Sequence, residues 1–177
     1  VSPGRASIDA ATLRTEGNYA KYMVALSRLQ QLNPDWLLYA SMQKQYAPKN
    51  LDASEKMVLG GPYGVRAYAP TEGIGDTGTL ATLELRRRVI WDKVPGNMVL
   101  AGFWDYGSVN ANHEPSPFST TGNTRTIQGY GLGVNWEPPG WYVRGSMAWR
   151  APWDAHSLEN SSPTRTPRLY FQAVKFF

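Results

Sequence analysis

One arginine and one aspartate stand out as groups that could pair away from bulk water. Arg66 lies in the Gly/Pro-rich stretch 60–68, and Asp105 lies further along the chain in the middle of the stretch 103–107. The second stretch alternates in the manner of a β-strand with one polar face. A guanidinium and a carboxylate form charge-assisted hydrogen bonds that are often bidentate. The two residues therefore predict an ion pair on the inner side of a β-structure.

Other residues that could carry chemistry have simpler interpretations. Residues 73–78 match the dinucleotide fingerprint G-x-G-x-x-G, but they open a β-patterned run, and that fingerprint needs a helix whose N–H groups meet phosphate. His113 and His156 lie in long polar loops without the converging ligands of a metal site or a catalytic triad. We expect no cofactor, no metal and no enzymatic activity.

The composition is that of one domain with an unusual share of aromatic residues. The chain has 177 residues, of which 42% are hydrophobic and 12% aromatic, and it contains no cysteine, which excludes disulfides and thiolate metal sites. The net charge is +4, but the only tight basic cluster is 86–88, so we expect no nucleic-acid partner. No apolar run approaches the roughly 18 to 20 residues that a membrane-spanning helix needs.

Seven segments have the alternation and the β-branched and aromatic enrichment of strands. Most are about ten residues long or longer, which is the length that a tilted strand needs to cross a bilayer. We therefore expect an all-β, antiparallel protein. The predicted strands are residues 20–31, 36–46, 77–91, 97–109, 124–136, 141–150 and 168–177.

The connections between these strands alternate between short and long. Short periplasmic turns and long extracellular loops are typical of an outer-membrane β-barrel. The pattern places the C-terminus on the side of the short turns. The short turns are 32–35, 92–96 and 137–140, and the long polar segments are 47–76, 110–123 and 151–167.

The alternation also assigns the two faces of the predicted sheet. With Asp105 in the lumen, Phe103 and Gly107 point inward as well, while Trp104 points to lipid. The next two strands repeat this division, and a soluble β-sandwich has less reason to oppose large rings to polar residues. The expected lipid-facing residues there are Tyr130, Leu132, Val134, Trp136, Trp141, Val143, Met147 and Trp149, and the expected lumenal ones are Gly129, Gly131, Gly133, Asn135, Tyr142, Arg144, Ser146 and Arg150.

Charged residues at inward positions are expected to pair with one another. Glu84 and Asp105 could be imagined as an acid–base pair, but in barrel register they are better partners for Arg66, Arg86, Arg88 or Arg144. We expect Glu84, Arg86 and Arg144 to be lumenal charges.

The chain resembles the C-terminal part of the two-partner-secretion transporters of Gram-negative bacteria, the TpsB family of haemolysin and filamentous-haemagglutinin exporters. The resemblance runs from about residue 20 to the end. The matching residues are Leu51, Asp52, Ala53, Ser54, Glu55, Lys56, Gly60, Gly61, Pro62, Val65, Arg66, Ala67, Tyr68, Gly75, Asp76, Thr77, Gly78, Leu83, Glu84, Leu85, Phe103, Trp104, Asp105, Tyr106, Gly107 and Phe177.

The resemblance implies a longer parent protein. Such transporters have a signal peptide, two POTRA domains and a sixteen-stranded barrel, so residues 1–177 would hold about the last seven strands, without the POTRA domains. Seven strands alone leave two open edges, which lipid does not tolerate. We therefore expect either a longer parent or a different strand count.

The resemblance also implies a functional loop. In the family, the loop that corresponds to 47–76 folds back into the barrel and carries a Val-Arg-Gly-Tyr/Phe tetrad, here Val65, Arg66, Ala67 and Tyr68. Its arginine contacts the inward-facing aspartate, here Asp105. Ala67 departs from the family glycine, and alanine would strain the loop tip if the position needs a positive φ. Phe177 corresponds to the C-terminal aromatic residue that the barrel-assembly machinery reads.

The function that the resemblance implies is export of a large partner protein across the bacterial outer membrane. The expected partners are a secreted TpsA-type protein such as a haemolysin or adhesin, outer-membrane lipid, and the barrel-assembly machinery during biogenesis. Three alternatives remain open at this point: an assembly or insertion factor of the same superfamily, a passive porin, and a soluble β-sandwich that binds a ligand.

Overall fold

The computed structural model describes residues 15, 17–115, 122–152 and 167–177, and its main element is one antiparallel sheet of seven strands. The predicted all-β class is confirmed. The strand order is β1-β2-β5-β6-β7-β8-β9, so sequence neighbours are also neighbours in space. The strands are β1 (Tyr22–Gln31), β2 (Trp36–Tyr46), β5 (Thr77–Val89), β6 (Asn97–Asn110), β7 (Thr124–Glu137), β8 (Trp141–Arg150) and β9 (Arg168–Lys175), and a small separate sheet pairs β3 (Met57–Val58) with β4 (Ile74–Gly75).

Three predicted strands were two residues too long at one end, and the first of them begins at Tyr22. The final strand stops at Lys175 because its partner β8 begins at Trp141, and the ladder ends at that pair. The N–H of Phe176 instead donates to the carbonyl of Gly140, and Phe177 is fully exposed. In the same way, β5 stops at Val89, where its ladder with β6 ends.

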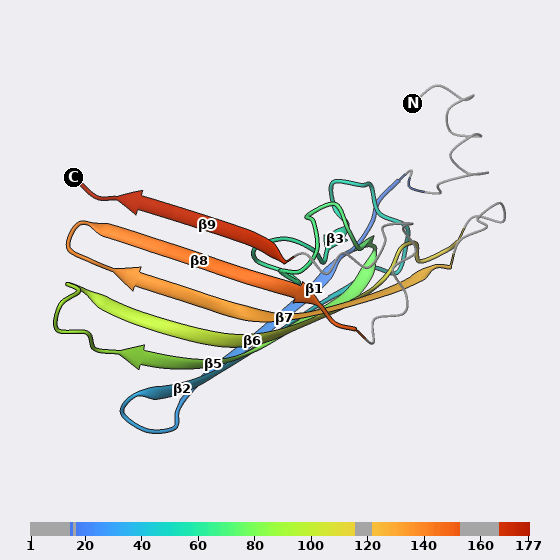
Figure 1. Cartoon of the computed structure of the whole chain (residues 1–177). Helices are drawn as coiled ribbons and strands as arrows, with labels where there is room; N and C mark the ends of the chain where they lie inside the picture. The colour runs from blue at the N-terminus through green and yellow to red at the C-terminus, as the bar shows by residue number, and fades with distance from the viewer. Residues whose placement is uncertain (1–14, 16, 116–121, 153–166) are drawn as a thin grey trace.

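The short and long connections separate to opposite ends of the sheet. Figure 1 shows the turns β1–β2, β5–β6 and β7–β8 at one end, together with the C-terminus, and the long connections at the other end. This is the segregation that the alternation of connection lengths predicted.

The longest of these connections, residues 47–76, folds back over one face of the sheet, which we call the inner face. The strands β3 and β4 lie within this loop and were not predicted, because two-residue strands have no readable period. The buried core lies between the loop and the sheet. The loop contributes Met57, Leu59, Val65, Ala67 and Tyr68, and the sheet contributes Phe103, Val109, Ile127 and Ala148.

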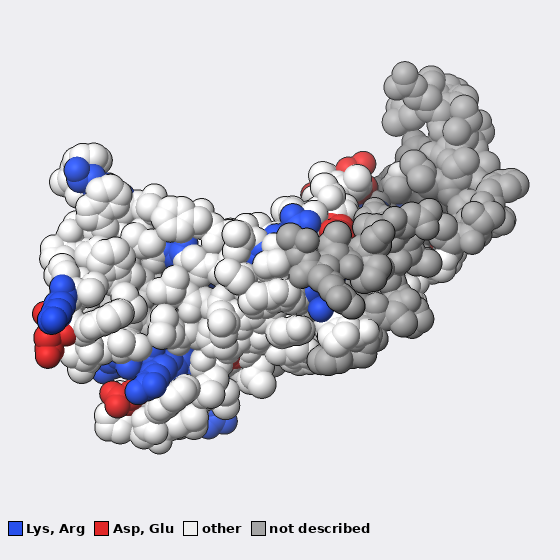
Figure 2. All heavy atoms as spheres, in the orientation of Figure 1, with Lys and Arg blue, Asp and Glu red and all other residues white. Residues whose placement is uncertain are grey.

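The outer face of the sheet is apolar and exposed. Leu100 and Trp104 on β6 and Leu132 on β7 lie there, and Leu132 retains 63% of its surface. In Figure 2, most of the visible charged side chains lie toward the ends of the strands, and the surface between them is mainly uncharged. Burial of a core thus explains the inner face of the sheet, whereas the exposed apolar side chains of the outer face suit a lipid environment.

Candidate functional site

The floor of the candidate site is built by two neighbouring strands. In the register of β5 with β6, Thr82 pairs with Asp105 and Glu84 pairs with Phe103. Because residues two apart share a face, all four side chains lie together on the inner face. The hydroxyl of Thr82 donates to Oδ1 of Asp105 over 3.0 Å, which helps to fix the orientation of the carboxylate.

Arg66 descends from the loop onto this floor and binds both carboxylates. Its Nε and Nη2 donate to Oδ2 and Oδ1 of Asp105, each over 2.8 Å, and its backbone N–H donates to Oδ2 over 3.1 Å. Its Nη1 lies 2.8 Å from Oε1 of Glu84. The guanidinium also lies over the ring of Phe103, 3.3 Å from the centroid. The contact between Arg66 and Asp105 that the family motif implies is therefore present, in bidentate form.

These charges are removed from water and balance one another. The side chains of Arg66, Asp105 and Glu84 are 6%, 1% and 8% exposed. A second arginine, Arg86, binds Oε2 of Glu84 at 2.6 Å, so that two cations meet two anions. Burial acts to lower the pKa of the Arg66 guanidinium, but the hydrogen bonds and charge of Asp105, followed by those of Glu84, raise it overall. Arg66 stays charged, and removing one partner would leave a buried charge.

The loop backbone around Arg66 is folded very tightly. The N–H of Val65 donates to the carbonyl of Leu59 over 2.7 Å, and the N–H of Gly61 donates to the carbonyl of Tyr68 over 3.0 Å. A Cβ on Gly60 would lie 1.9 Å from a backbone oxygen, and Gly61 has a φ of +111°. Both positions therefore require glycine. The tetrad thus lies in a small, closed segment of the loop. We call residues 59–73 the hairpin, because β3 and β4 pair antiparallel at its two ends.

The two tetrad residues after Arg66 pack against the later strands. Ala67 is 4% exposed, and a Cβ built on Gly129 of β7 would lie 2.6 Å from the Ala67 methyl. The methyl that departs from the family pattern thus occupies space left by a glycine on the facing strand. Tyr68 is 1% exposed, its ring lies under the guanidinium of Arg150 at 4.5 Å, and its carbonyl accepts the hydroxyl of Tyr170 over 3.1 Å.

Three more of the predicted glycines lie where the loop and β5 approach β6. A Cβ on Gly75 would meet the carbonyl of Asn110 at 2.3 Å, and one on Gly78 would meet the side chain of Val109 at 2.5 Å. A Cβ on Gly107 would meet Leu59 and Val65 of the loop at 3.0 Å. They give room for close packing of the loop on the sheet.

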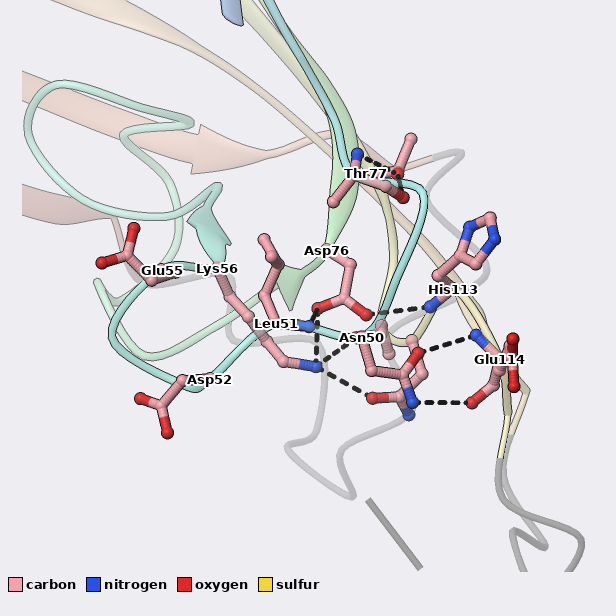
Figure 3. Close-up of polar contacts among 12 residues, drawn as sticks. Asn50, Leu51, Asp52, Glu55, Lys56, Asp76, Thr77, His113 and Glu114 are labelled. Atoms are coloured by element: carbon pink, nitrogen blue, oxygen red, sulfur yellow. Dashed lines mark hydrogen bonds and ion pairs between the residues drawn. The ribbon is translucent and has the colours of Figure 1, made fainter. Parts of the chain in front are cut away.

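At its base, the loop is fastened by a third buried carboxylate, Asp76, that was matched only as part of the family pattern. Figure 3 shows it between the start of the loop and the β6–β7 connection. Its oxygens accept the backbone N–H of Leu51 over 3.1 Å and that of His113 over 2.8 Å. The ammonium of Lys56 lies 3.0 Å from Oδ1. Nearby, the Asn50 amide exchanges two hydrogen bonds with the backbone of Glu114.

A fourth buried carboxylate, Glu72, was missed by sequence reasoning. It is 6% exposed and lies among arginines of the last three strands, with Oε1 3.0 Å from Nη2 of Arg150. An isolated acid in a loop has no periodicity, so its own position gave no signal. The available signal was Arg150, which the alternation had already placed on the inner face.

The remaining predicted charge, Arg144, lies on the inner face but apart from Glu84. Its guanidinium lies 5.7 Å from the ring centroid of Tyr63, at the tip of the loop hairpin. Glu84 is satisfied by Arg66 and Arg86.

The described residues contain neither a metal-binding cluster nor a helix that could span a membrane. No group of three or more histidine, cysteine, aspartate or glutamate side chains there is placed to hold a metal ion. The described part also contains no helix with the length and apolarity to cross a membrane. His156 lies outside the described residues.

Comparison with known proteins gives matches that agree with this architecture. A heme/hemopexin transporter protein, HuxB, of Haemophilus influenzae is 29% identical over 132 residues, which cover 72% of this chain and 23% of HuxB. The solved structure of CdiB from Escherichia coli superposes with a TM-score of 0.66 at 17% identity, covering 88% of this chain and 27% of CdiB. The chain thus spans about a quarter of the length of these proteins.

The chain is thus similar to HuxB in sequence and to CdiB in fold, in agreement with the predicted resemblance. Its seven-stranded sheet matches part of the larger CdiB chain. The model of the Omp85 superfamily domain matches residues 5–177. The chain belongs to the Omp85 superfamily.

Proposed function

We propose that this chain forms the part of an outer-membrane transporter that carries its lumenal loop, and that the intact transporter exports a secreted partner protein. The observation that carries the proposal is the docking of loop 47–76 on the inner face through Arg66, Asp105 and Glu84. A passive porin has no need of a buried bidentate pair that holds a folded hairpin inside its wall. A soluble sandwich would not leave the outer apolar face exposed.

The geometry suggests how the loop could serve transport. The hairpin tip, Pro62 and Tyr63, borders a cavity of about 280 Å³ that also reaches Tyr39 and Arg86. Tyr63 itself is 76% exposed. The tip therefore has space beside it, and this space reaches Arg66, whereas Val65, Ala67 and Tyr68 of the tetrad are closely packed. A polypeptide that passes through the barrel would meet Tyr63 first, and Arg66 would determine how far the hairpin can shift.

The energy for such export is proposed to come from folding of the partner outside the cell. Residues 73–78 match the dinucleotide-binding fingerprint, which would need to open a helix. In the structure this pattern belongs to the loop and the start of β5, where it packs against β6 and opens no helix. HuxB is by name a transporter, which favours transport over barrel assembly as the role of this chain. We also propose that the partner is a secreted TpsA-type protein, that the transporter contacts outer-membrane lipid, and that the transporter depends on the barrel-assembly machinery during biogenesis.

The experiment is a secretion assay with the full-length protein and its cognate secreted partner. Arg66→Ala is expected to reduce secretion sharply while folded barrel still accumulates in the outer membrane. Arg87→Ala is the matched control, because Arg87 is an exposed neighbour on β5 whose guanidinium lies near the ring of Trp36 and not in the site. Normal secretion by the Arg66 variant at normal barrel levels would refute the proposed role.

A further inference from the structure

The carboxylate of Glu72 joins the end of the tetrad hairpin to the last strands of the sheet. Within the loop, Oε1 accepts the N–H of Ala69 over 3.0 Å, and the Glu72 carbonyl accepts the N–H of Gly60 over 3.1 Å. Outside the loop, the same carboxylate meets Nη2 of Arg150 at 3.0 and 3.2 Å. One side chain therefore closes the hairpin and anchors it.

Three strands supply the cations around this carboxylate. Besides Arg150 on β8, Nη2 of Arg125 on β7 lies 3.6 Å from Oε2, and Nη2 of Arg168 on β9 lies 4.0 Å from Oε1. Three positive charges within this range repel one another unless an anion lies between them. Glu72 thus stabilises the packing of the ends of β7, β8 and β9 as well as the position of the hairpin.

The Arg66 and Glu72 contacts hold the loop from different sides. Arg66 binds acids on β5 and β6, whereas Glu72 binds bases on β7, β8 and β9. The Glu72 contacts are also closer to water, because the side chains of Arg125, Arg150 and Arg168 are 17%, 17% and 38% exposed. Salt screens exposed ion pairs far more than buried ones. Of these two attachments, that of Glu72 is therefore the more sensitive to ionic strength, because its arginines are more exposed than Arg66 while the Glu72 side chain is 8% exposed.

We infer that Glu72 is a positioning residue that couples the tetrad hairpin to the last three strands, independently of Arg66. In the proposed transporter, it determines whether a shift of the hairpin is transmitted to β8 and β9. Release of Arg66 alone then leaves the hairpin attached to β7–β9, and full release requires loss of both contacts. The inference rests on the proposed function only for its meaning in export.

The test is hydrogen exchange of the full-length protein in detergent micelles, read in peptides that cover 59–73. We expect Glu72→Gln to speed exchange there by about tenfold or more, because a hydrogen bond to a charged group contributes on that scale. High salt should speed the same exchange in the wild type and have little further effect in the variant. The matched control is Glu55→Gln in the same loop, where Glu55 meets Lys21 at 2.7 Å on the surface.

A second measurement separates this inference from the function itself. In planar bilayers, Glu72→Gln combined with Arg66→Ala should give larger and steadier conductance than either single change, and this needs no secreted partner. Wild-type exchange and unchanged salt dependence in Glu72→Gln would overturn the inference. If Glu72→Gln yields no folded barrel, Glu72→Asp replaces it, with an intermediate acceleration expected, and wild-type exchange in that variant overturns the inference equally.

Discussion

The tip and the base of loop 47–76 are both fastened by a buried aspartate, but the partners of the two aspartates differ in kind. At the tip, Asp105 is bound chiefly by the Arg66 side chain, with one backbone N–H of the same residue. At the base, Asp76 accepts backbone N–H groups from two separate segments, at Leu51 and His113, and Lys56 adds its ammonium. At the tip both the principal donor and the acceptor are side chains, whereas at the base the Asp76 side chain accepts from N–H groups that the backbone holds in place. The difference indicates that the tip depends on one pair of side chains, and that the base joins two separate backbone segments through one carboxylate.

The largest effect is expected when the tip loses its carboxylate. Asp105→Ala leaves the Arg66 guanidinium buried with Glu84 and without its bidentate partner. Breaking a buried pair in this way typically costs about 3–5 kcal/mol. Urea unfolding of the full-length protein, followed by tryptophan fluorescence, should show a loss of this size. A loss below about 1 kcal/mol would place the tip pair among the weak surface contacts.

A smaller loss is expected when the base loses its carboxylate. Asp76→Ala removes the carboxylate that two backbone N–H groups and one ammonium share. We expect the free energy of unfolding to fall by about 1–3 kcal/mol, the cost of an unsatisfied buried group. Exchange of the Leu51 and His113 amides should accelerate in this variant and stay unchanged in Asp105→Ala. Accelerated exchange at these amides in Asp105→Ala would show that tip and base are one unit.

The contact between the tetrad and β7 can be tested by exchange of one methyl group. Gly129→Ala should destabilise the protein by about 1–3 kcal/mol, as overpacking of a filled site does, because the new Cβ would lie 2.6 Å from that of Ala67. Ala67→Gly in the same chain should restore most of the loss. Additive effects of the two changes in unfolding measurements would exclude direct contact between these residues.

The smallest effect is expected at Lys56. Its ammonium meets Asp76 and also donates to the Ala111 carbonyl over 2.6 Å, but its loss leaves the carboxylate with both of its backbone N–H donors. Lys56→Met should therefore cost less than Asp76→Ala by the same unfolding measurement. A loss as large as that of Asp76→Ala would show that the ion pair of Lys56 with Asp76 holds the base of the loop, and that the hydrogen bonds from the N–H groups of Leu51 and His113 contribute little.

The sequence predicted the sheet well because a barrel strand has a period and its turns have a composition. The inward direction of Asp105 followed from alternation, and its contact with Arg66 followed from the family resemblance. The base could not be predicted, since the partners of Asp76 are N–H groups, which leave no trace in the identities of Leu51 and His113. The fit of Ala67 to Gly129 was also hidden, because each residue is unremarkable without the other.

The central claim is that the pairing of Arg66 with Asp105 holds the hairpin of loop 47–76 on the inner face of the sheet. Residues 1–177 contain no cysteine, and any cysteine elsewhere in the full-length protein is first replaced by serine, so that spin labels can be attached through Tyr63→Cys at the tip and Gln172→Cys on β9, two positions that line the same cavity. In the full-length protein in membranes, electron–electron distance measurements should give one short, narrow distribution. Asp105→Ala should broaden it, because the tip loses its pair while Glu72 still holds the hairpin to the last strands, and Asp105→Ala with Glu72→Gln should also shift it to longer distances. A broad distribution in the wild type, or an unchanged narrow one in Asp105→Ala, would contradict the claim.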